Sequence, residues 1–444
     1  MGDAVSERES TRTSRPFRVL HLIDPTNPAV GACGAALLAD LLAGQTVAAR
    51  DSAVIVGGSG AERLARRVGL QTPDRIAPPA ERGWLAATTL RRYLARRGPF
   101  DLIQAWSVSM LSLASTVAPT TPRAVMLLMN PDDDAEAHWL RSISGGGEPV
   151  ALAITNEIRR AWAARGAPGE RIHVLRPGLD FARVDGGVRG RIRHEWGVAD
   201  ETQVVAALAH PPSRIGGRRL GKALVIMRLR RLDVALVMSP GVRRRAAGAA
   251  IAEAAGEGDR LIFDERLDEP WRILPACDAG LLLGDDTQEV NRTAPAAPPS
   301  RTGRWPSLVA PAHRHHEVGP ADAMSGVLPA HWAAVAGKPI VAEASYAATE
   351  VVENRHTGLL VTPGDDGAVV NRVAELAGDA QLHWKLRDAA RSEAYSVFSR
   401  RRFVSDLRAV HEQIIEGRRV EPPPLPVTGG VAFGVGARGG APAD

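Results

Sequence analysis

The sequence is poor in several features that would place it in a specialised class of protein. Its 444 residues include only two cysteines, Cys33 and Cys277, which lie far apart and have no neighbouring Cys or His at ligand spacing. This argues against a disulfide framework and a zinc site, and it fits a reducing compartment. No apolar run approaches the roughly 20 residues that a membrane-spanning helix needs, and the amino end lacks an apolar signal core. We therefore expect a cytoplasmic protein.

Lysine and aromatic residues are also scarce. Lys222, Lys338 and Lys385 are the only lysines, so arginine carries the basic excess behind a net charge of +5 and a pI of about 9.7. Aromatic residues make up 4% of the chain, and no stretch interleaves them with arginine as single-strand binders do. Nucleic-acid binding is therefore not indicated. An arginine-rich surface suits phosphates and acidic lipid headgroups, which leaves peripheral contact with a membrane open. A general preference for Arg over Lys explains the composition equally well.

What the chain does contain is enough apolar material for two domains. Hydrophobic residues make up 45% of a chain too long for one ordinary domain. Short apolar strands such as 234–238 alternate with helices, among them one expected over 269–276. We expect disorder in the polar start, 1–16, and in the Pro- and Gly-rich tail, 418–444. A low-complexity insert, 285–321, is expected to be poorly ordered.

The stretch 324–363 organises the second half of the chain. It predicts a helix that Gly337 ends, a strand over 339–342, a helix from Thr349 and a strand over 358–362. Elements in this order form a parallel unit. The loops at the carboxyl ends of such strands are where nucleotides usually bind.

This stretch resembles the donor-binding half of glycosyltransferase family 4, whose members are retaining glycosyltransferases with two domains in the GT-B arrangement. The landmarks, in order, are Leu328-Pro329-Ala330, Ala336-Gly337-Lys338-Pro339-Ile340-Val341, Glu350-Val351-Val352-Glu353-Asn354, Thr357-Gly358-Leu359-Leu360-Val361 and Pro363-Gly364-Asp365. The resemblance implies an α/β fold with two Rossmann-like, doubly wound parallel-sheet domains and a cleft between them. It also implies a hexosyltransferase-like enzyme, which moves a sugar with retention from a nucleotide-diphospho-sugar to a glycan, lipid or small-molecule acceptor. No cofactor and no metal are expected.

The resemblance also divides the chain. The segment 151–180 is similar to the part of the family that leads into the hinge between the domains. It implies an acceptor-side domain over 17–180, a linker over 181–188 and a nucleotide-sugar-binding domain over 189–399. A helix over 400–417 is expected to return across the cleft to the first domain.

Several positions match the family's binding residues. Arg214 and Arg219 stand where the family has a basic pair for the donor diphosphate. Two guanidinium groups at a helix start would offset the charge that develops on a departing diphosphate. The resemblance further assigns the donor or acceptor loop to Gly31 and Gly34, and the donor phosphate loop to Ser345, Tyr346 and Thr349. From the residues alone, a solvated arginine-rich loop and glycines that merely turn a strand into a helix explain the first two sets as well.

Other positions depart from the family pattern. Met324 and Trp332 stand where the family carries its two donor-site glutamates, and Gln104 and Trp106 replace two histidines. Met and Trp cannot supply the acceptor oxygens that contact a sugar and a ribose. These substitutions leave a second interpretation open, a non-catalytic relative that binds a nucleotide, a glycan or a protein partner.

Overall fold

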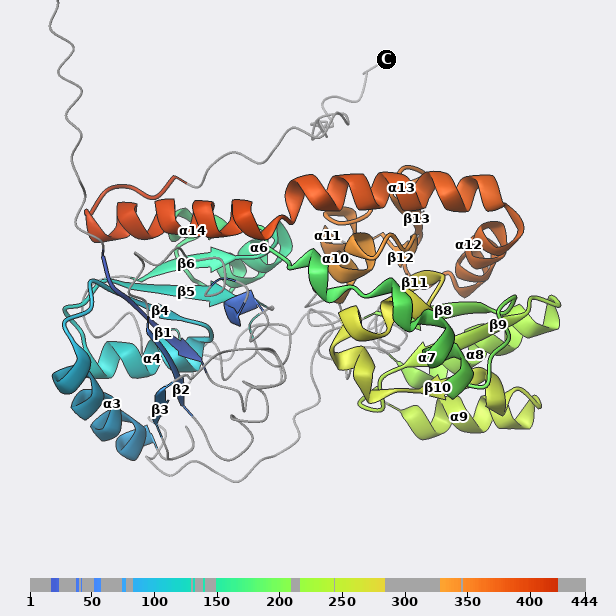
Figure 1. Cartoon of the computed structure of the whole chain (residues 1–444), viewed down its shortest axis with the longest axis horizontal. Coiled ribbons are helices and arrows are strands. Elements are labelled where there is room, and N and C mark those ends of the chain that lie inside the picture. The colour runs from blue at the N-terminus through green and yellow to red at the C-terminus, as the bar shows by residue number, and fades with distance from the viewer. Residues whose placement is uncertain are drawn as a thin grey trace, which may run out of the picture.

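The computed structural model describes two α/β domains that lie side by side (Figure 1). It describes residues 17–23, 37–39, 41, 52–56, 74–76, 83–128, 131, 139, 149–208, 216–242, 244–283, 328–344 and 346–421. Arg214, Gly31, Gly34, Ser345 and Met324 lie outside these residues, as do 1–16, the insert 285–321 and, in the expected disordered tail, 422–444. None of the helices in the described ranges combines the length and apolar character required for crossing a bilayer.

The first domain is built on a parallel sheet of seven strands in the order β3-β2-β1-β4-β5-β6-β7. The strands are β1 (Val19–Ile23), β2 (Ser52–Val56), β3 (Asp74–Ile76), β4 (Leu102–Ala105), β5 (Arg123–Leu127), β6 (Val150–Ala153) and β7 (Ile172–Val174). Its helices include α3 (Gly83–Arg97), α4 (Val108–Val117) and α6 (Asn156–Ala164). The strand order reverses between β1 and β4, which makes the sheet doubly wound.

The second domain repeats this plan with six parallel strands in the order β10-β9-β8-β11-β12-β13. They are β8 (Gln203–Ala207), β9 (Val234–Met238), β10 (Leu261–Phe263), β11 (Ala279–Leu282), β12 (Ile340–Glu343) and β13 (Gly358–Val361). The helices are α7 (Arg189–Glu195), α8 (Gly217–Leu229), α9 (Arg245–Ala254), α10 (Leu328–Val335), α11 (Tyr346–Thr349), α12 (Asp366–Gly378) and α13 (Ala380–Val397). The predicted fold class, two doubly wound parallel-sheet domains, is confirmed.

Two predicted helices were wrong. The chain over 269–276 forms two 3-10 turns, Pro270–Arg272 and Leu274–Ala276, because Pro275 has no N–H for the carbonyl four residues earlier and would interrupt a continuous helix. The helix expected to start at Thr349 instead ends there, as α11. The next residue, Glu350, has its side chain turned toward the first domain. This tertiary contact favours a turn over a continued helix.

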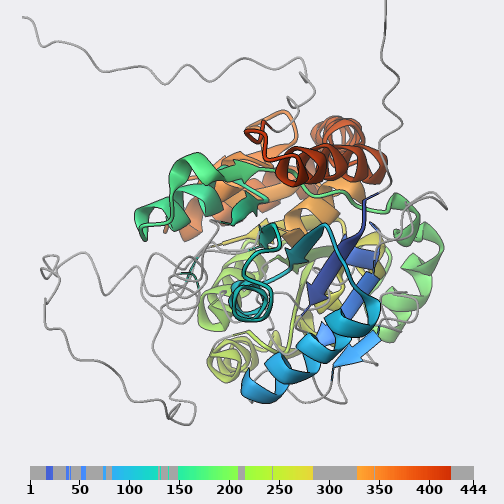
Figure 2. The same ribbon diagram turned by 90° about the vertical axis from the view of Figure 1, so that its left-hand side faces the viewer.

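A last helix, α14 (Arg400–Ile415), runs along the first domain. Figure 1 shows it following α13 end to end along the top of the molecule, and both helices are also at the top in Figure 2. Between the two helices, the Phe398 carbonyl accepts a hydrogen bond from Leu179 N at 2.8 Å. A Cβ on the adjacent Gly178 would lie 2.2 Å from Phe403 Cβ, so only glycine permits this approach. The end of the first domain and the start of α14 therefore meet at one point.

Candidate functional site

The carboxyl edges of the two sheets meet at the domain interface. Asn156 and Glu157 open α6, directly after β6, and their backbone N–H groups donate to the two carboxylate oxygens of Glu350 at 2.8 and 2.9 Å. Glu350 follows α11, just beyond the carboxyl end of β12. In doubly wound sheets this edge is where ligands bind, and a domain interface is a preferred place for a pocket. We therefore place the candidate site between these edges.

Helix α8 reaches this edge from β8. Its N-cap is Gly216, which supplies no side chain to the first N–H groups of the helix. The helix packs so closely on α9 that a Cβ on Gly248 would lie 2.2 Å from the Gly217 carbonyl oxygen. On the facing side, a Cβ on Gly221 would lie 2.5 Å from the Gly248 carbonyl oxygen. These glycines therefore allow the backbones of α8 and α9 to touch.

Arg219, in the first turn of α8, holds two acidic residues. Its Nη2 lies 2.6 Å from Glu343 Oε1 at the end of β12, and its Nε lies 2.5 Å from Asp366 Oδ1 at the start of α12. Gly364 N also donates to Glu343. Burial opposes the charge of Arg219, but the hydrogen bonds from Arg219 to Glu343 and Asp366 raise its pKa. Its guanidinium therefore neutralises carboxylates at this edge, and to bind a diphosphate it would exchange one of them for a phosphate oxygen.

The residues expected in the donor phosphate loop are only partly described. Tyr346 and Thr349 are the first and last residues of α11, and Thr349 is exposed. Glu343, a carboxylate at the end of the neighbouring strand β12, is 3% exposed and is held by Arg219. In this arrangement the Glu343 carboxylate neutralises an arginine of the protein itself.

Trp332 lies in the core. It is 1% exposed, and its ring centroid lies 5.0 Å from that of Trp271. Its indole N–H has no hydrogen-bond partner within the described part of the chain. All eight residues of α10 are buried. Trp332 therefore packs in the core, whereas the resembled glycosyltransferase family has a glutamate that contacts the ribose at this position.

The two positions where the resembled family has histidines are buried as well. Trp106 Nε1 donates to His21 Nδ1 at 3.3 Å, and Gln104 Oε1 lies 3.0 Å from His411 Nε2. These contacts join β1, β4 and α14 into one buried polar group. Sequence reasoning missed His21 and His411, because a single histidine in an apolar strand or a helix carries no motif.

One group of described residues has the geometry to hold a metal. Oxygen or nitrogen atoms of Glu353, His356 and Glu393 all lie within 4.8 Å of one another. Burial, followed by the charge of Glu353, raises the pKa of Glu393. Glu353 and His356 come from the turn between α11 and β13, and Glu393 comes from α13. They do not take part in the candidate site.

No protein-family model and no curated protein matches the sequence. Solved structures do match. The Anabaena protein Alr3699/HepE in complex with UDP-glucose superposes with a TM-score of 0.64 at 17% identity, over 90% of this chain and 99% of that one. A glycosyltransferase from Rickettsia africae ESF-5 has a TM-score of 0.61 at 11% identity, over 90% and 99%. A UDP-N-acetylglucosamine 2-epimerase has a TM-score of 0.56 at 11% identity, over 92% and 98%.

These matches show that the chain has the GT-B fold. At such low identity they carry the fold alone, and the presence of an epimerase among them shows that the fold serves more than one reaction. The reaction must therefore be argued from the site.

Proposed function

We propose that the chain is a glycosyltransferase that binds a nucleotide-diphospho-sugar between its domains and passes the sugar to a glycan, lipid or small-molecule acceptor. The main support is the meeting of the two carboxyl edges, shown by the contact between Glu350 and the start of α6. A donor bound on one edge and an acceptor on the other would then face each other. Alr3699/HepE, which shares this fold, has been captured with UDP-glucose.

The proposed chemistry is that of family 4, a transfer with retention. Arg214 and Arg219 would bind the diphosphate, assisted by the open N–H groups at the start of α8. Positive side chains and a helix start offset the charge on the leaving diphosphate, so this mechanism requires no metal. The remaining contacts are proposed for Gly31, Gly34, Ser345, Tyr346 and Thr349. The domain limits 17–180 and 189–399, a cytoplasmic location and a peripheral membrane contact belong to the same proposal.

The burial of Trp332 supports a second candidate function. Losing a hydrogen bond to a charged group costs about 1.5–3 kcal/mol, and about 1.4 kcal/mol corresponds to a tenfold rate. Met324, Trp332, Gln104 and Trp106 replace four polar groups of the family at once. A non-catalytic GT-B relative that binds a nucleotide, a glycan or a protein partner is the alternative that these replacements favour.

The test is calorimetric titration of the purified protein with UDP, GDP, ADP and their sugars. We expect one nucleotide to bind, and its affinity to fall about tenfold or more in Arg214→Ala. Arg191→Ala, an exposed arginine on α7, is the matched control and should leave the affinity unchanged. Arg214 is preferred to Arg219 as the diagnostic position because Arg219 also holds Glu343 and Asp366.

The outcomes separate the two candidates. Binding followed by transfer of a labelled sugar to an acceptor supports the enzyme. Binding without transfer or donor hydrolysis supports the non-catalytic relative. A folded protein that binds no member of the nucleotide panel contradicts the transferase.

A further inference from the structure

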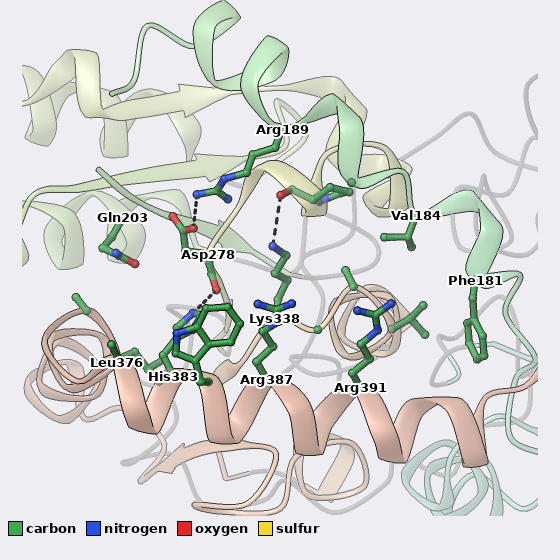
Figure 3. Close-up of a pocket in the computed structure, with 18 of the residues that line it drawn as sticks. Phe181, Val184, Arg189, Gln203, Asp278, Lys338, Leu376, His383, Arg387 and Arg391 are labelled. Carbon is green, nitrogen blue, oxygen red and sulfur yellow. Dashed lines mark hydrogen bonds and ion pairs between the residues drawn. The ribbon is translucent and has the colours of Figure 1, made fainter. Parts of the chain in front are cut away.

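A cavity of about 640 Å³ opens on the second domain at the edge opposite to the candidate site (Figure 3). Gln203 begins β8, Asp278 immediately precedes β11, and Lys338 stands just before β12. These residues mark the amino edge of the sheet. The walls are the linker, with Phe181 and Val184, and the helix α13.

Positive charge exceeds negative charge in this cavity. Among the described residues, its lining holds four cationic side chains, Arg189, Lys338, Arg387 and Arg391, and one carboxylate, Asp278. That carboxylate is already bound, at 2.8 Å by Arg189 and at 3.2 Å by Arg193. Within the described ranges, no carboxylate pairs with Arg387 or Arg391. An anion entering the cavity would find cations that are not already neutralised.

Three of these cations come from α13 and from the turn before β12, and the Lys338 ammonium also donates to the Pro275 carbonyl at 3.3 Å. Figure 3 shows Arg387 and Arg391 extending from α13 into the cavity beside Lys338. Gly337, with a φ of +64°, packs against both arginine side chains. A Cβ at this position would be 3.3 Å from Arg387 Cγ and 3.6 Å from Arg391 Cδ. The absence of a side chain at Gly337 therefore leaves room for the two arginine side chains to pass over this turn.

Exposed aromatic rings border the same cations. Trp384 is 54% exposed, and the Arg387 guanidinium lies 4.4 Å from its ring centroid. Tyr395 is 44% exposed, with Arg391 at 5.6 Å and the Phe181 ring at 4.4 Å. Aromatic surface left open beside a pocket commonly marks a binding site. Here it offers a flat apolar surface next to an anion site.

We propose that this cavity binds a small phosphorylated organic molecule, with its phosphate on Arg387, Arg391 and Lys338 and its body against the aromatic rings. Guanidinium groups bind phosphate oxygens through paired hydrogen bonds, and lysine adds a compact charge. The volume lies within the range of about 300–1,000 Å³ that small-molecule pockets occupy. A sugar phosphate has the required size and charge.

The position of the cavity assigns this ligand the role of an effector. It lies at the amino edge, away from the interface where the carboxyl edges meet. Its two walls are the linker and α13, and α13 leads directly into α14 on the first domain. If the affinity of a ligand that touches both walls depends on their spacing, binding would shift the domains toward the arrangement with the higher affinity.

The experiment is titration of the full-length protein with glucose 6-phosphate, inorganic phosphate and glucose. We expect glucose 6-phosphate to bind more tightly than inorganic phosphate, and glucose not to bind. Affinity for glucose 6-phosphate should fall about tenfold or more in Arg387→Gln and in Arg391→Gln. Lys385→Gln is the matched control, because Lys385 is exposed on the same helix and does not line the cavity.

A second measurement distinguishes the loss of a binding contact from misfolding of the variant. Binding should change the tryptophan fluorescence, and Trp384→Phe should abolish this change while the thermal unfolding profile is retained. The proposal is wrong if glucose 6-phosphate fails to bind the folded protein, or binds Arg387→Gln and Arg391→Gln as well as the parent.

Two further outcomes locate the phosphate elsewhere. If UDP or another bound nucleotide displaces glucose 6-phosphate competitively, glucose 6-phosphate binds in the cleft between the domains, and the proposal is wrong. If vesicles of phosphatidylcholine and phosphatidic acid bind through the same arginines and glucose 6-phosphate does not, the phosphate belongs to a membrane. None of these results depends on whether the protein transfers sugars.

Discussion

The carboxylate of Glu350, in the second domain, lies 2.5 Å from the guanidinium of Arg176, in the first. Both side chains are largely buried, with 12% and 8% exposed. The same carboxylate accepts the backbone N–H groups of Asn156 and Glu157, so it also caps α6. A single side chain thus joins the carboxyl edges of the two sheets.

Replacing this carboxylate should loosen the domain interface. Glu350→Ala leaves Arg176 without its carboxylate partner and removes the acceptor of the Asn156 and Glu157 N–H groups, although Thr155 still caps α6. We expect the free energy of unfolding to fall by about 3 kcal/mol. Chemical denaturation measures the loss, and small-angle X-ray scattering should show a larger radius of gyration. Glu201→Ala, at an exposed position in the same domain, is the control. An unchanged radius in Glu350→Ala would contradict a role in holding the domains together.

Arg219 should be needed for stability apart from any role in binding. Arg219→Ala leaves Glu343 buried without its cation, and we expect a loss of about 3–5 kcal/mol. Adding Glu343→Gln should recover part of this loss, because the amide carries no charge and still accepts the Gly364 N–H. Urea unfolding of both variants checks this. Arg218→Ala, at a half-buried neighbour, should have a much smaller effect.

The contact between α8 and α9 should not tolerate a methyl group. Gly248→Ala places a Cβ 2.2 Å from the Gly217 carbonyl, so the helices must separate, and we expect a loss of about 1–3 kcal/mol. Gly190→Ala, in α7, meets nothing within 4 Å and should stabilise the protein by about 0.5–1 kcal/mol. Thermal unfolding of the two variants compares them directly. Equal effects would show that the helices can move apart freely.

Binding in the amino-edge cavity should depend on pH through Lys338. Burial lowers the pKa of Lys338 to about 8; the charge of Asp278 acts to raise it, whereas the charges of Arg189 and Arg387 lower it further. Burial also raises the pKa of Cys277 to about 12, so this thiol stays protonated. Above a pH of about 8 the cavity loses the positive charge of Lys338. Affinity for glucose 6-phosphate should therefore fall as the pH rises through that value.

Calorimetry across this pH range checks the prediction, since the phosphate group is already a dianion above about pH 7. Lys338→Gln should bind more weakly and lose the pH dependence. If Lys338→Gln keeps the same pH profile as the parent, another group is responsible.

Much of the fold could be predicted because its signals are local. Val234–Met238 is a short apolar run between turns, and it forms a strand whose five residues are all buried. Gly337 ends a helix with a positive φ, as its place before Lys338-Pro339 indicated. One of the two failures has a local cause as well, since Pro275 interrupts the stretch over 269–276 that was expected to be helical.

The candidate site was less predictable. The sequence located Arg219 at the start of a helix, but its carboxylate partners come from β12 and α12, far along the chain. No spacing within the sequence shows that pairing. Trp332 likewise was recognisable as a departure from a family pattern, while its packing against Trp271 required the tertiary structure.

The sequence by itself determined the elements and their class, because burial periodicity and Gly or Pro boundaries act over a few residues. It also carried the basic composition on which both proposed phosphate sites depend. Only the tertiary structure decided which charges remain available. It neutralised Arg219 and Arg176 with distant carboxylates, turned Trp332 inward, and brought Lys338 and α13 together at the amino edge. Such pairings depend on residues far apart in the chain that become neighbours only when the sheets and helices pack.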